Sequence, residues 1–322
     1  MTMRLGILST ARINRLVLAG ARESNRVEVA AVASRDPARA EAYAAEHGIP
    51  RTHASYEGLL ADEDVDAVYI PLPNSLHVEW SIRALEAGKH VLCEKPLSRN
   101  PAEVERAFEV AERTGLVVAE AFMYRHNPQT AQLKKLVEGG EIGDLQVIRA
   151  AFSFTITDDA NIRLAAELDG GALMDVGCYC VSGARLLAGE PARVYGVSVE
   201  ERGVDTAFAG TLEFAGGVVA QFDCGFRLPT RDELEAIGTE GSIFLDDPWH
   251  CRRPVIELRR DGDVRELALE PVDSYRLELE NLADAIDGTA APLLGRQDAL
   301  GQARAIEALY RSAASGEAAA PA

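Results

Sequence analysis

Residues 90–96 read HVLCEKP, and this stretch decides the fold. Its apolar residues suit a strand that is covered on both faces, where apolar side chains need not alternate with polar ones. Pro96 has no N–H for a sheet ladder and favours an extended residue before it, so the strand ends there. Lys95 then lies at the carboxyl end of the strand, which is where open α/β sheets bind ligands. The alternative is a solvated loop lysine beside Glu94.

The length and charge of the chain limit what it can be. Its 322 residues exceed what one hydrophobic core usually supports, so two domains are expected. Asp and Glu outnumber Lys and Arg by 51 to 33, which gives a formal net charge of −18. Such an acidic chain is a poor partner for nucleic acids and anionic membranes. The first eight residues offer no export signal, and no uncharged run is long enough to span a bilayer.

The five cysteines form no CxxC pair and show no zinc-type spacing, so no metal site is expected. Their odd number and apolar neighbours predict reduced, mostly buried thiols, and therefore a cytoplasmic protein. They are Cys93, Cys178, Cys180, Cys224 and Cys251.

A turn between a strand and a helix follows the first residues of the chain. Residues 4–8 are a short apolar strand, and GILSTA covers residues 6–11. A dinucleotide-binding fold needs small residues at such a turn, so that backbone N–H groups and the helix N-terminus can approach a pyrophosphate. Gly6, Ser9 and Ala11 are small here, although only one of them is glycine. An ordinary strand-to-helix turn is the alternative.

The next strand ends where dinucleotide folds distinguish NAD from NADP. Residues 27–33 form that strand, and Ser34, Arg35 and Asp36 follow it. An acidic residue at the strand end would bond the 2′-hydroxyl of NAD, whereas Ser34 and Arg35 could bond and neutralise the 2′-phosphate of NADP. We therefore expect NADP, and Asp36 keeps NAD open as the alternative cofactor.

The rest of the first part repeats the βαβ pattern of a parallel sheet. The turn PLPNSLH, residues 71–77, follows a strand at residues 65–70 and brings polar groups to the same carboxyl edge, where it could line the nicotinamide and ribose. His77 is expected to begin a helix rather than to act as a base. Helices are expected at residues 37–47, 56–61, 78–87 and 101–114, and a strand at 116–121.

After residues 122–128 the chain becomes rich in strands, which indicates a domain boundary. We expect a dinucleotide-binding domain at residues 1–122 and a substrate-binding and oligomerisation domain at residues 123–322. The predicted fold class is α/β: an N-terminal Rossmann domain with a parallel sheet, and a C-terminal α+β domain with a large open, mostly antiparallel sheet.

Turn sequences at residues 215–217 and 260–263 predict hairpins in that second sheet. The Ala-rich end after Ser315 is expected to fray. Strands are expected at residues 145–155, 192–200, 207–214, 217–226, 233–238, 242–245, 255–259 and 264–269, and helices at 131–138, 275–287 and 297–314.

Residues 170–179 read GGALMDVGCY, a flexible loop that enters a helix. Asp175 and Tyr179 are four residues apart, which on a helix places both side chains on one face. Small neighbours such as Gly171 and Gly177 flank them. The alternative, with Asp175 as a helix-start residue and Tyr179 in the core, is about as common for such a pair.

Lys95, Asp175 and Tyr179 together suit a nicotinamide-dependent dehydrogenase, which needs a group to take or give the hydroxyl proton while hydride moves. A free tyrosine has a pKa of about 10, and a neighbouring ammonium favours the phenolate. Tyr179 is therefore the expected general acid or base. The positive charge of Lys95 would favour its phenolate form, and Lys95 would also bond the reacting oxygen. Lys95 as the proton donor is the alternative. Asp175 would orient sugar hydroxyls or Lys95.

Five motifs, in this order along the chain, resemble the glucose-fructose oxidoreductase, inositol dehydrogenase and rhizopine-catabolism (Gfo/Idh/MocA) family. They are GILSTARI at residues 6–13, PLPNSLH at 71–77, EKP at 94–96, Tyr124-Arg125 and DVGCY at 175–179. The resemblance covers nearly the whole chain. It implies an N-terminal Rossmann domain and a C-terminal α/β domain whose open sheet usually forms oligomer contacts. It also implies oxidation or reduction of sugars, cyclitols and related alcohols or carbonyls.

The resemblance implies roles for individual residues as well. Lys95 matches the family's active-site lysine, Asp175 its helix-start acid, and Tyr179 a position that is often His in inositol-type members. A tyrosine there is more similar to the glucose-fructose oxidoreductase, aldose dehydrogenase and dihydrodiol dehydrogenase branch, many of whose members use NADP. Tyr124 and Arg125 would lie near the nicotinamide. The residues predicted to contact the cofactor are Gly6, Ser9, Thr10, Ala11, Arg12, Ile13, Ser34, Arg35, Pro71, Leu72, Asn74, His77, Glu94, Lys95 and Arg125.

The sequence thus predicts an NADP-preferring dehydrogenase or reductase that transfers hydride between the nicotinamide and a sugar or related polyol or carbonyl. An aldose dehydrogenase of the xylose or glucose type, or a sugar ketoreductase, is the expected activity. A cofactor-binding sensor or regulatory protein without turnover is the alternative, since one fold hosts many functions. We expect a homo-oligomer, a dimer or a tetramer, formed through the C-terminal sheet.

Overall fold

A computed structural model describes residues 2–321, which group into two compact units. The first unit comprises Met1–Met123 and Asp273–Leu300, and the second comprises Tyr124–Val272 and Gly301–Ala322. The expected division at residues 122/123 therefore differs from this grouping in one segment. Residues 273–300 join the first unit because helix α8 (Ser274–Ile286) packs its apolar face on α1 (Asn14–Glu23) and on the sheet beside it.

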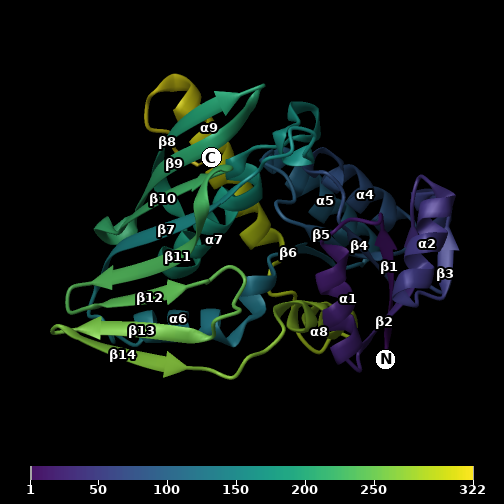
Figure 1. Cartoon of the computed structure of the whole chain (residues 1–322), viewed down its shortest axis with the longest axis horizontal. Helices are drawn as coiled ribbons and strands as arrows, with labels where there is room; N and C mark the ends of the chain where they lie inside the picture. The colour runs from purple at the N-terminus through teal and green to yellow at the C-terminus, as the bar shows by residue number, and fades with distance from the viewer. Residues whose placement is uncertain (1, 322) are drawn as a thin grey trace. The chain divides into compact units, whose positions relative to one another are not determined.

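The first unit contains a six-stranded, entirely parallel sheet (Figure 1). Its strand order is β3-β2-β1-β4-β5-β6, the doubly wound order in which the direction of winding reverses between β1 and β4. The predicted Rossmann domain is confirmed. The strands are β1 (Met3–Leu8), β2 (Val27–Ala33), β3 (Arg51–His53), β4 (Ala67–Ile70), β5 (His90–Glu94) and β6 (Val118–Ala121).

Helices connect these strands, and their ends follow simple capping chemistry. Asp36 caps α2 by accepting from Ala38 N at 3.0 Å, and Gly48 ends the same helix with a left-handed φ of 71°. Asn100 and Gly115 do the same for α5. The remaining elements of this unit are α2 (Pro37–His47), α3 (Tyr56–Leu60), η1 (Asn74–Leu76), α4 (His77–Glu86) and α5 (Pro101–Thr114).

The second unit contains an eight-stranded sheet of order β14-β13-β12-β11-β7-β10-β9-β8, in which only β7 and β10 pair in parallel within residues 2–321. The predicted, mostly antiparallel sheet is confirmed. Its hairpins turn at residues 215–217 and 260–263, as expected. The strands are β7 (Leu145–Thr155), β8 (Pro191–Glu201), β9 (Val204–Phe214), β10 (Val219–Gly225), β11 (Arg227–Gly238), β12 (Ser242–Asp246), β13 (Val255–Arg260) and β14 (Asp263–Ala268).

The second unit also contains the helices α6 (Pro128–Glu138) and α7 (Cys178–Ala188), and most of α9 (Arg296–Ser315), whose residues 296–300 group with the first unit. The segment after α9 was expected to fray, but hydrogen bonds hold it in place. Ala319 exchanges two backbone hydrogen bonds with Val194 of β8, at 2.8 and 2.9 Å. Ser312 Oγ also donates to the carbonyl of Glu317 at 2.6 Å. These polar contacts outweigh the weak packing of an Ala-rich segment.

All five cysteines are buried and unbridged in the described residues, as the sequence predicts. Between residues 2 and 321, no helix combines the length and the apolar character that a membrane span requires.

Candidate active site

The carboxyl edge of the six-stranded sheet brings several predicted residues together. Ser9 follows β1 with an unusual positive φ of 116°, and its N–H donates to Ala33 of β2 at 3.0 Å. Its hydroxyl donates to the carbonyl of Pro71, after β4, at 3.3 Å. The ends of β1, β2 and β4 therefore meet at Ser9, at the switch point of the sheet where such folds bind ligands.

The turn after Ser9 leaves backbone donors available. The N–H groups of Thr10, Ala11, Arg12 and Ile13 have no acceptor among residues 2–321, and they precede the first turn of α1. A run of donors at a helix N-terminus fits a pyrophosphate. This geometry suits the dinucleotide-binding role predicted for these four residues.

Gly6 serves packing rather than the turn. It lies inside β1, where an added Cβ would sit 2.7 Å from Leu59 Cδ2 of α3 and 3.0 Å from Val65. The close contact between β1 and α3 explains why this residue is small, and its contact with the cofactor stays a prediction.

The end of β2 gathers positive charge. Asp36 is the residue for which NAD stayed an alternative cofactor. Its carboxylate caps α2 by accepting from the backbone N–H groups of Ala38 and Arg39. Arg35 is exposed, and Arg39 lies on the first turns of α2; neither forms an ion pair within the described residues. Burial raises the pKa of Tyr56, whereas the nearby guanidinium groups of Arg35 and Arg39 act in the opposite direction, so both cations lie close to its hydroxyl. The sequence analysis missed Arg39, which only the helical turn brings beside Arg35.

His77 braces two loops of the same edge. It is 1% exposed, and its ring nitrogens lie 2.8 Å from the carbonyls of Pro96 and Leu72. Burial lowers the pKa of His77 to about 4, so the neutral ring donates to one of the two carbonyls at neutral pH. His77 begins α4, as expected, and joins the turn at residues 71–77 to the segment after Lys95.

Glu94 and Lys95 end β5, as predicted, and Glu94 turns toward the first unit's interior. Tyr69 donates to Glu94 Oε1 at 2.5 Å, and Lys95 N donates to Oε2 at 3.3 Å. Burial, followed by the charge of Glu94, raises the pKa of both Tyr69 and Glu278 of α8. The neutral form of Glu278 is therefore favoured by its burial and by the neighbouring Glu94.

In the second unit, Asp175 lies in a π-helical turn (Leu173–Gly177) that runs directly into α7. Such turns occur often at functional sites, and no pattern in the sequence predicted this one. The buried carboxylate of Asp205 holds its start, accepting from Leu173 N at 2.6 Å and from Tyr310 at 2.8 Å. Gly177 is small because a Cβ there would lie 2.8 Å from Cys224 Sγ of β10.

Tyr179, on the first turn of α7, is 6% exposed and packed among aromatic rings. Its ring centroid lies 5.3 Å from Phe152, 5.7 Å from Tyr124 and 6.0 Å from Trp249. The adjacent residue Arg125 donates to Ser182 of α7 at 3.3 Å, and Tyr124 donates to the same hydroxyl at 2.7 Å. These contacts fix the direction of the phenol ring.

Two other polar clusters are complete in themselves. Asp232 and Asp247 surround His250, with Asp232 Oδ2 at 2.5 Å from His250 Nδ1, and Arg252 pairs with Asp247 at 2.6 Å. Burial lowers the pKa of His250, but hydrogen bonds to both carboxylates raise it to about 9 overall. Both acids are therefore neutralised by cations of the chain, which leaves this cluster poorly suited to a metal ion.

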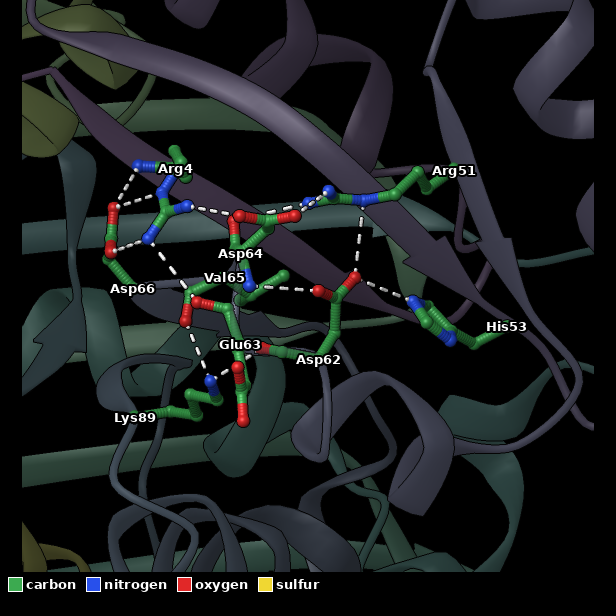
Figure 2. Close-up of polar contacts among 9 residues, drawn as sticks. All are labelled: Arg4, Arg51, His53, Asp62, Glu63, Asp64, Val65, Asp66 and Lys89. Carbon is green, nitrogen blue, oxygen red and sulfur yellow. Dashed lines mark hydrogen bonds and ion pairs between the residues drawn. The ribbon is translucent and has the colours of Figure 1, made fainter.

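The second cluster lies at the amino edge of the six-stranded sheet, where three cations bind the segment of residues 62–66 (Figure 2). A cavity of about 310 Å³ beside it is lined by Met3, Lys89 and Ile286, among others. The polar groups drawn there bind one another, so this cavity shows no sign of a ligand. Arg4 pairs with Asp66 at 2.7 Å and with Asp64 at 2.8 Å. Arg51 pairs with Asp62 at 3.2 Å and with Asp64 at 2.8 Å. Lys89 donates to the carbonyls of Asp62 and Val65 at 2.7 and 2.8 Å.

Comparison with known families decides the affiliation of the chain. Residues 3–122 match the oxidoreductase family with an NAD-binding Rossmann fold, and residues 130–244 match the GFO/IDH/MocA C-terminal domain. The chain belongs to the GFO/IDH/MocA family. The resemblance expected from the five motifs is confirmed, and so is the expectation of an oxidoreductase.

Members of this family with assigned activities are similar over almost the whole chain. D-xylose 1-dehydrogenase (NADP(+)) 2 of Haloferax volcanii is 41% identical, over 98% of this chain and 99% of its own. A 3-ketoreductase of Actinomadura kijaniata, crystallised with NADP and TDP-benzene, is 32% identical with a TM-score of 0.92, over 97% and 98% of the two chains. An aldose-aldose oxidoreductase of Caulobacter crescentus, complexed with glycerol, is 29% identical with a TM-score of 0.92, over 99% and 100%.

Proposed function

We propose that this oxidoreductase prefers NADP and transfers hydride between the nicotinamide and C1 of an aldose or a neighbouring ketone. Among the relatives, the similarity to a D-xylose 1-dehydrogenase supports an aldose as substrate. D-xylose and D-glucose are therefore the first candidates.

The observation that carries the cofactor part is the pair of cations Arg35 and Arg39 at the end of β2, with Asp36 occupied as a helix cap. Two guanidinium groups without acidic partners in the described residues fit the 2′-phosphate of NADP, and Ser34 adds a hydroxyl. The donors of residues 10–13 fit the pyrophosphate. The turn at residues 71–77 would line the ribose and nicotinamide.

The chemistry assigned to the chain's own residues is proton transfer and orientation. When bound, the nicotinamide cofactor accepts or supplies the hydride. Tyr179 takes or gives the hydroxyl proton, and Lys95 stabilises the phenolate and bonds the reacting oxygen. Asp175 accepts hydrogen bonds from sugar hydroxyls. The aromatic rings around Tyr179 fix its direction and exclude water.

The open sheet of the second unit supports a homo-oligomer as the working form of the enzyme. Tyr195, Val197 and Val199 of β8 expose 43%, 53% and 58% of their surface, which is unusual for large apolar residues that recur on one strand. Burying them against a second copy would remove this apolar surface from water.

A substrate panel with both cofactors tests the proposal. D-xylose, D-glucose and xylitol would be assayed with NADP⁺ and NAD⁺ by the absorbance of the reduced cofactor. We expect turnover of at least one aldose with NADP⁺, and a loss of about a hundredfold or more in kcat for Tyr179→Phe with unchanged NADPH affinity. Wild-type turnover in this variant would contradict the role of Tyr179. Cofactor binding without turnover of any member would contradict the proposed substrate class.

A further inference from the structure

The loop of residues 156–172 leads into the π-helical turn that carries Asp175, and one side chain of the loop binds that carboxylate. Arg163 Nε donates to Asp175 Oδ2 at 2.5 Å. The side chain of Asp175 is 17% exposed, and that of Arg163 is 41% exposed. An exposed ion pair contributes little by itself, but a charged hydrogen bond this short to a half-buried acid restricts where the acid can point.

The position of Arg163 is set by the fold of the loop. Its N–H donates to Asn161 Oδ1 at 3.1 Å, and its carbonyl accepts from Gly171 N at 2.9 Å. An added Cβ on Gly170 would lie 2.5 Å from the same carbonyl, so the loop closes tightly around Arg163. The guanidinium lies 5.8 Å above the ring of Phe154. The loop therefore delivers Arg163 to Asp175 rather than to an incoming ligand.

The charge of the loop favours hydroxyl groups over phosphates. Residues 156–172 contain four acids and a single cation, Arg163. Arg202, which reaches this loop from the turn between β8 and β9, pairs with Asp159 at 2.8 Å. Phosphate groups are bound by Arg or Lys donors that are not neutralised by carboxylates, whereas carboxylates accept readily from sugar hydroxyls. The four acids are Asp158, Asp159, Glu167 and Asp169.

We infer that Arg163 is a positioning residue that orients Asp175, and that its loop selects an uncharged sugar or polyol over a phosphorylated or nucleotide-linked sugar. This inference rests on the proposed function, because it takes Asp175 to face the substrate. It separates the chain from the ketoreductase relative that was crystallised with TDP-benzene, a ligand that carries a diphosphate.

A comparison of substrates tests the inferred preference for uncharged sugars. The kcat/KM for D-xylose and D-glucose would be compared with that for D-glucose 6-phosphate and TDP-glucose, each with NADP⁺. We expect the free sugars to be preferred by about a hundredfold or more, because the diphosphate would face carboxylates without free cations. Equal or better turnover of a phosphorylated sugar would overturn the inference while leaving the proposed oxidoreductase chemistry intact. Turnover of none of the four would overturn the proposed function itself.

Variants of Arg163 test its role, with Arg202 as the matched control because it makes the same kind of pair with the same loop. Arg163→Ala should lower kcat with the best free sugar about tenfold to a hundredfold, with unchanged NADPH affinity. Arg163→Lys should retain part of the activity, and millimolar guanidinium should restore part of it to Arg163→Ala. Arg202→Ala should keep wild-type kcat. Equal losses in Arg163→Ala and Arg202→Ala, or wild-type kcat in Arg163→Ala, would overturn the positioning role.

Discussion

The two ends of strand β5 carry the same side chain in opposite settings. Lys89 precedes the strand, is 7% exposed, and donates to the carbonyls of Asp62 and Val65 at 2.7 and 2.8 Å. Lys95 follows the strand and is half-buried at the carboxyl edge. A buried ammonium must find acceptors within the chain, and Lys89 does so by binding the loop before β4. Lys89 therefore stabilises the fold, whereas we propose that Lys95 takes part in the reaction.

The same contrast holds for the two edges of the sheet. At the amino edge, the cations drawn in Figure 2 bind neighbouring carboxylates or carbonyls, so the edge is complete without a ligand. At the carboxyl edge, the N–H groups of residues 10–13 have no acceptor among residues 2–321, and the cations Arg35 and Arg39, which lie by Tyr56, have no acidic partner there. Such an edge is suited to an anionic ligand, and the pyrophosphate and the 2′-phosphate of NADP are the anionic groups that we propose to bind there.

Replacing Lys95 should have the largest effect. Lys95→Met keeps the length of the side chain and removes the charge, so kcat should fall about 10² to 10⁴-fold, as for loss of a group that acts in proton transfer. Thermal stability and NADPH affinity should change little. Steady-state kinetics, a melting curve and a fluorescence titration measure the three quantities. Wild-type kcat in Lys95→Met would remove the contrast between the two ends of β5.

Acid should weaken the carboxyl edge through His77. Its pKa in the folded protein, about 4, lies below the ordinary value of 6.5, so its contribution to stability is complete above pH 6.5 and is lost as the pH falls toward 4. A shift of this size corresponds to about 3 kcal/mol. Urea unfolding at pH 7.5 and pH 4.5 should therefore show a larger loss for the wild type than for His77→Gln, which cannot titrate.

His90, at the start of β5, serves as the comparison for His77. Burial lowers its pKa as well, but its ring is only half-buried, so His90→Gln should change the acid dependence less than His77→Gln does. An equal change in both variants would show that the acid dependence does not distinguish the two edges.

Replacing Lys89 should affect stability alone. Lys89→Met would leave the carbonyls of Asp62 and Val65 without their donor, at a cost of about 1 to 3 kcal/mol in the free energy of unfolding. The kcat with the best sugar should stay within a factor of about two, because the change lies at the amino edge. A large drop in kcat with unchanged stability would mean that the amino edge takes part in the reaction.

The sequence predicted the elements well because each has a local cause. Buried strands, capped helices and glycine turns can be recognised from neighbouring residues, and the end of β5 at Glu94 and the hairpin at residues 260–263 agree with the structure. The π-helical turn at Asp175 could not be predicted, because it depends on the carboxylate of Asp205, thirty residues away in the chain. The same is true of Arg163, an ordinary loop arginine until the loop brings it to Asp175.

The grouping of residues 273–300 with the first unit could not be predicted for a related reason. The amphipathic pattern of α8 predicts a helix but not the surface that covers its apolar face, and here that surface is α1 and the first sheet. Gly6 is a related case, since the small size that the sequence analysis attributed to a cofactor-binding turn is explained by the close approach of Leu59. Long-range contacts decide both cases.

The smallest effect is expected at the end of β2, where it would sharpen the contrast between paired and unpaired cations. Arg35→Ala/Arg39→Ala should weaken NADPH binding by about tenfold and leave NADH binding unchanged, because only NADPH carries the 2′-phosphate and exposed cations are partly screened. The difference should shrink at high salt. The control is Arg51→Ala, which removes an arginine that already binds Asp64 at 2.8 Å and should alter neither affinity. Equal losses for both cofactors in the double variant would mean that these arginines support the fold of α2 rather than bind the phosphate. Other residues of the carboxyl edge would then have to determine the preference for NADP.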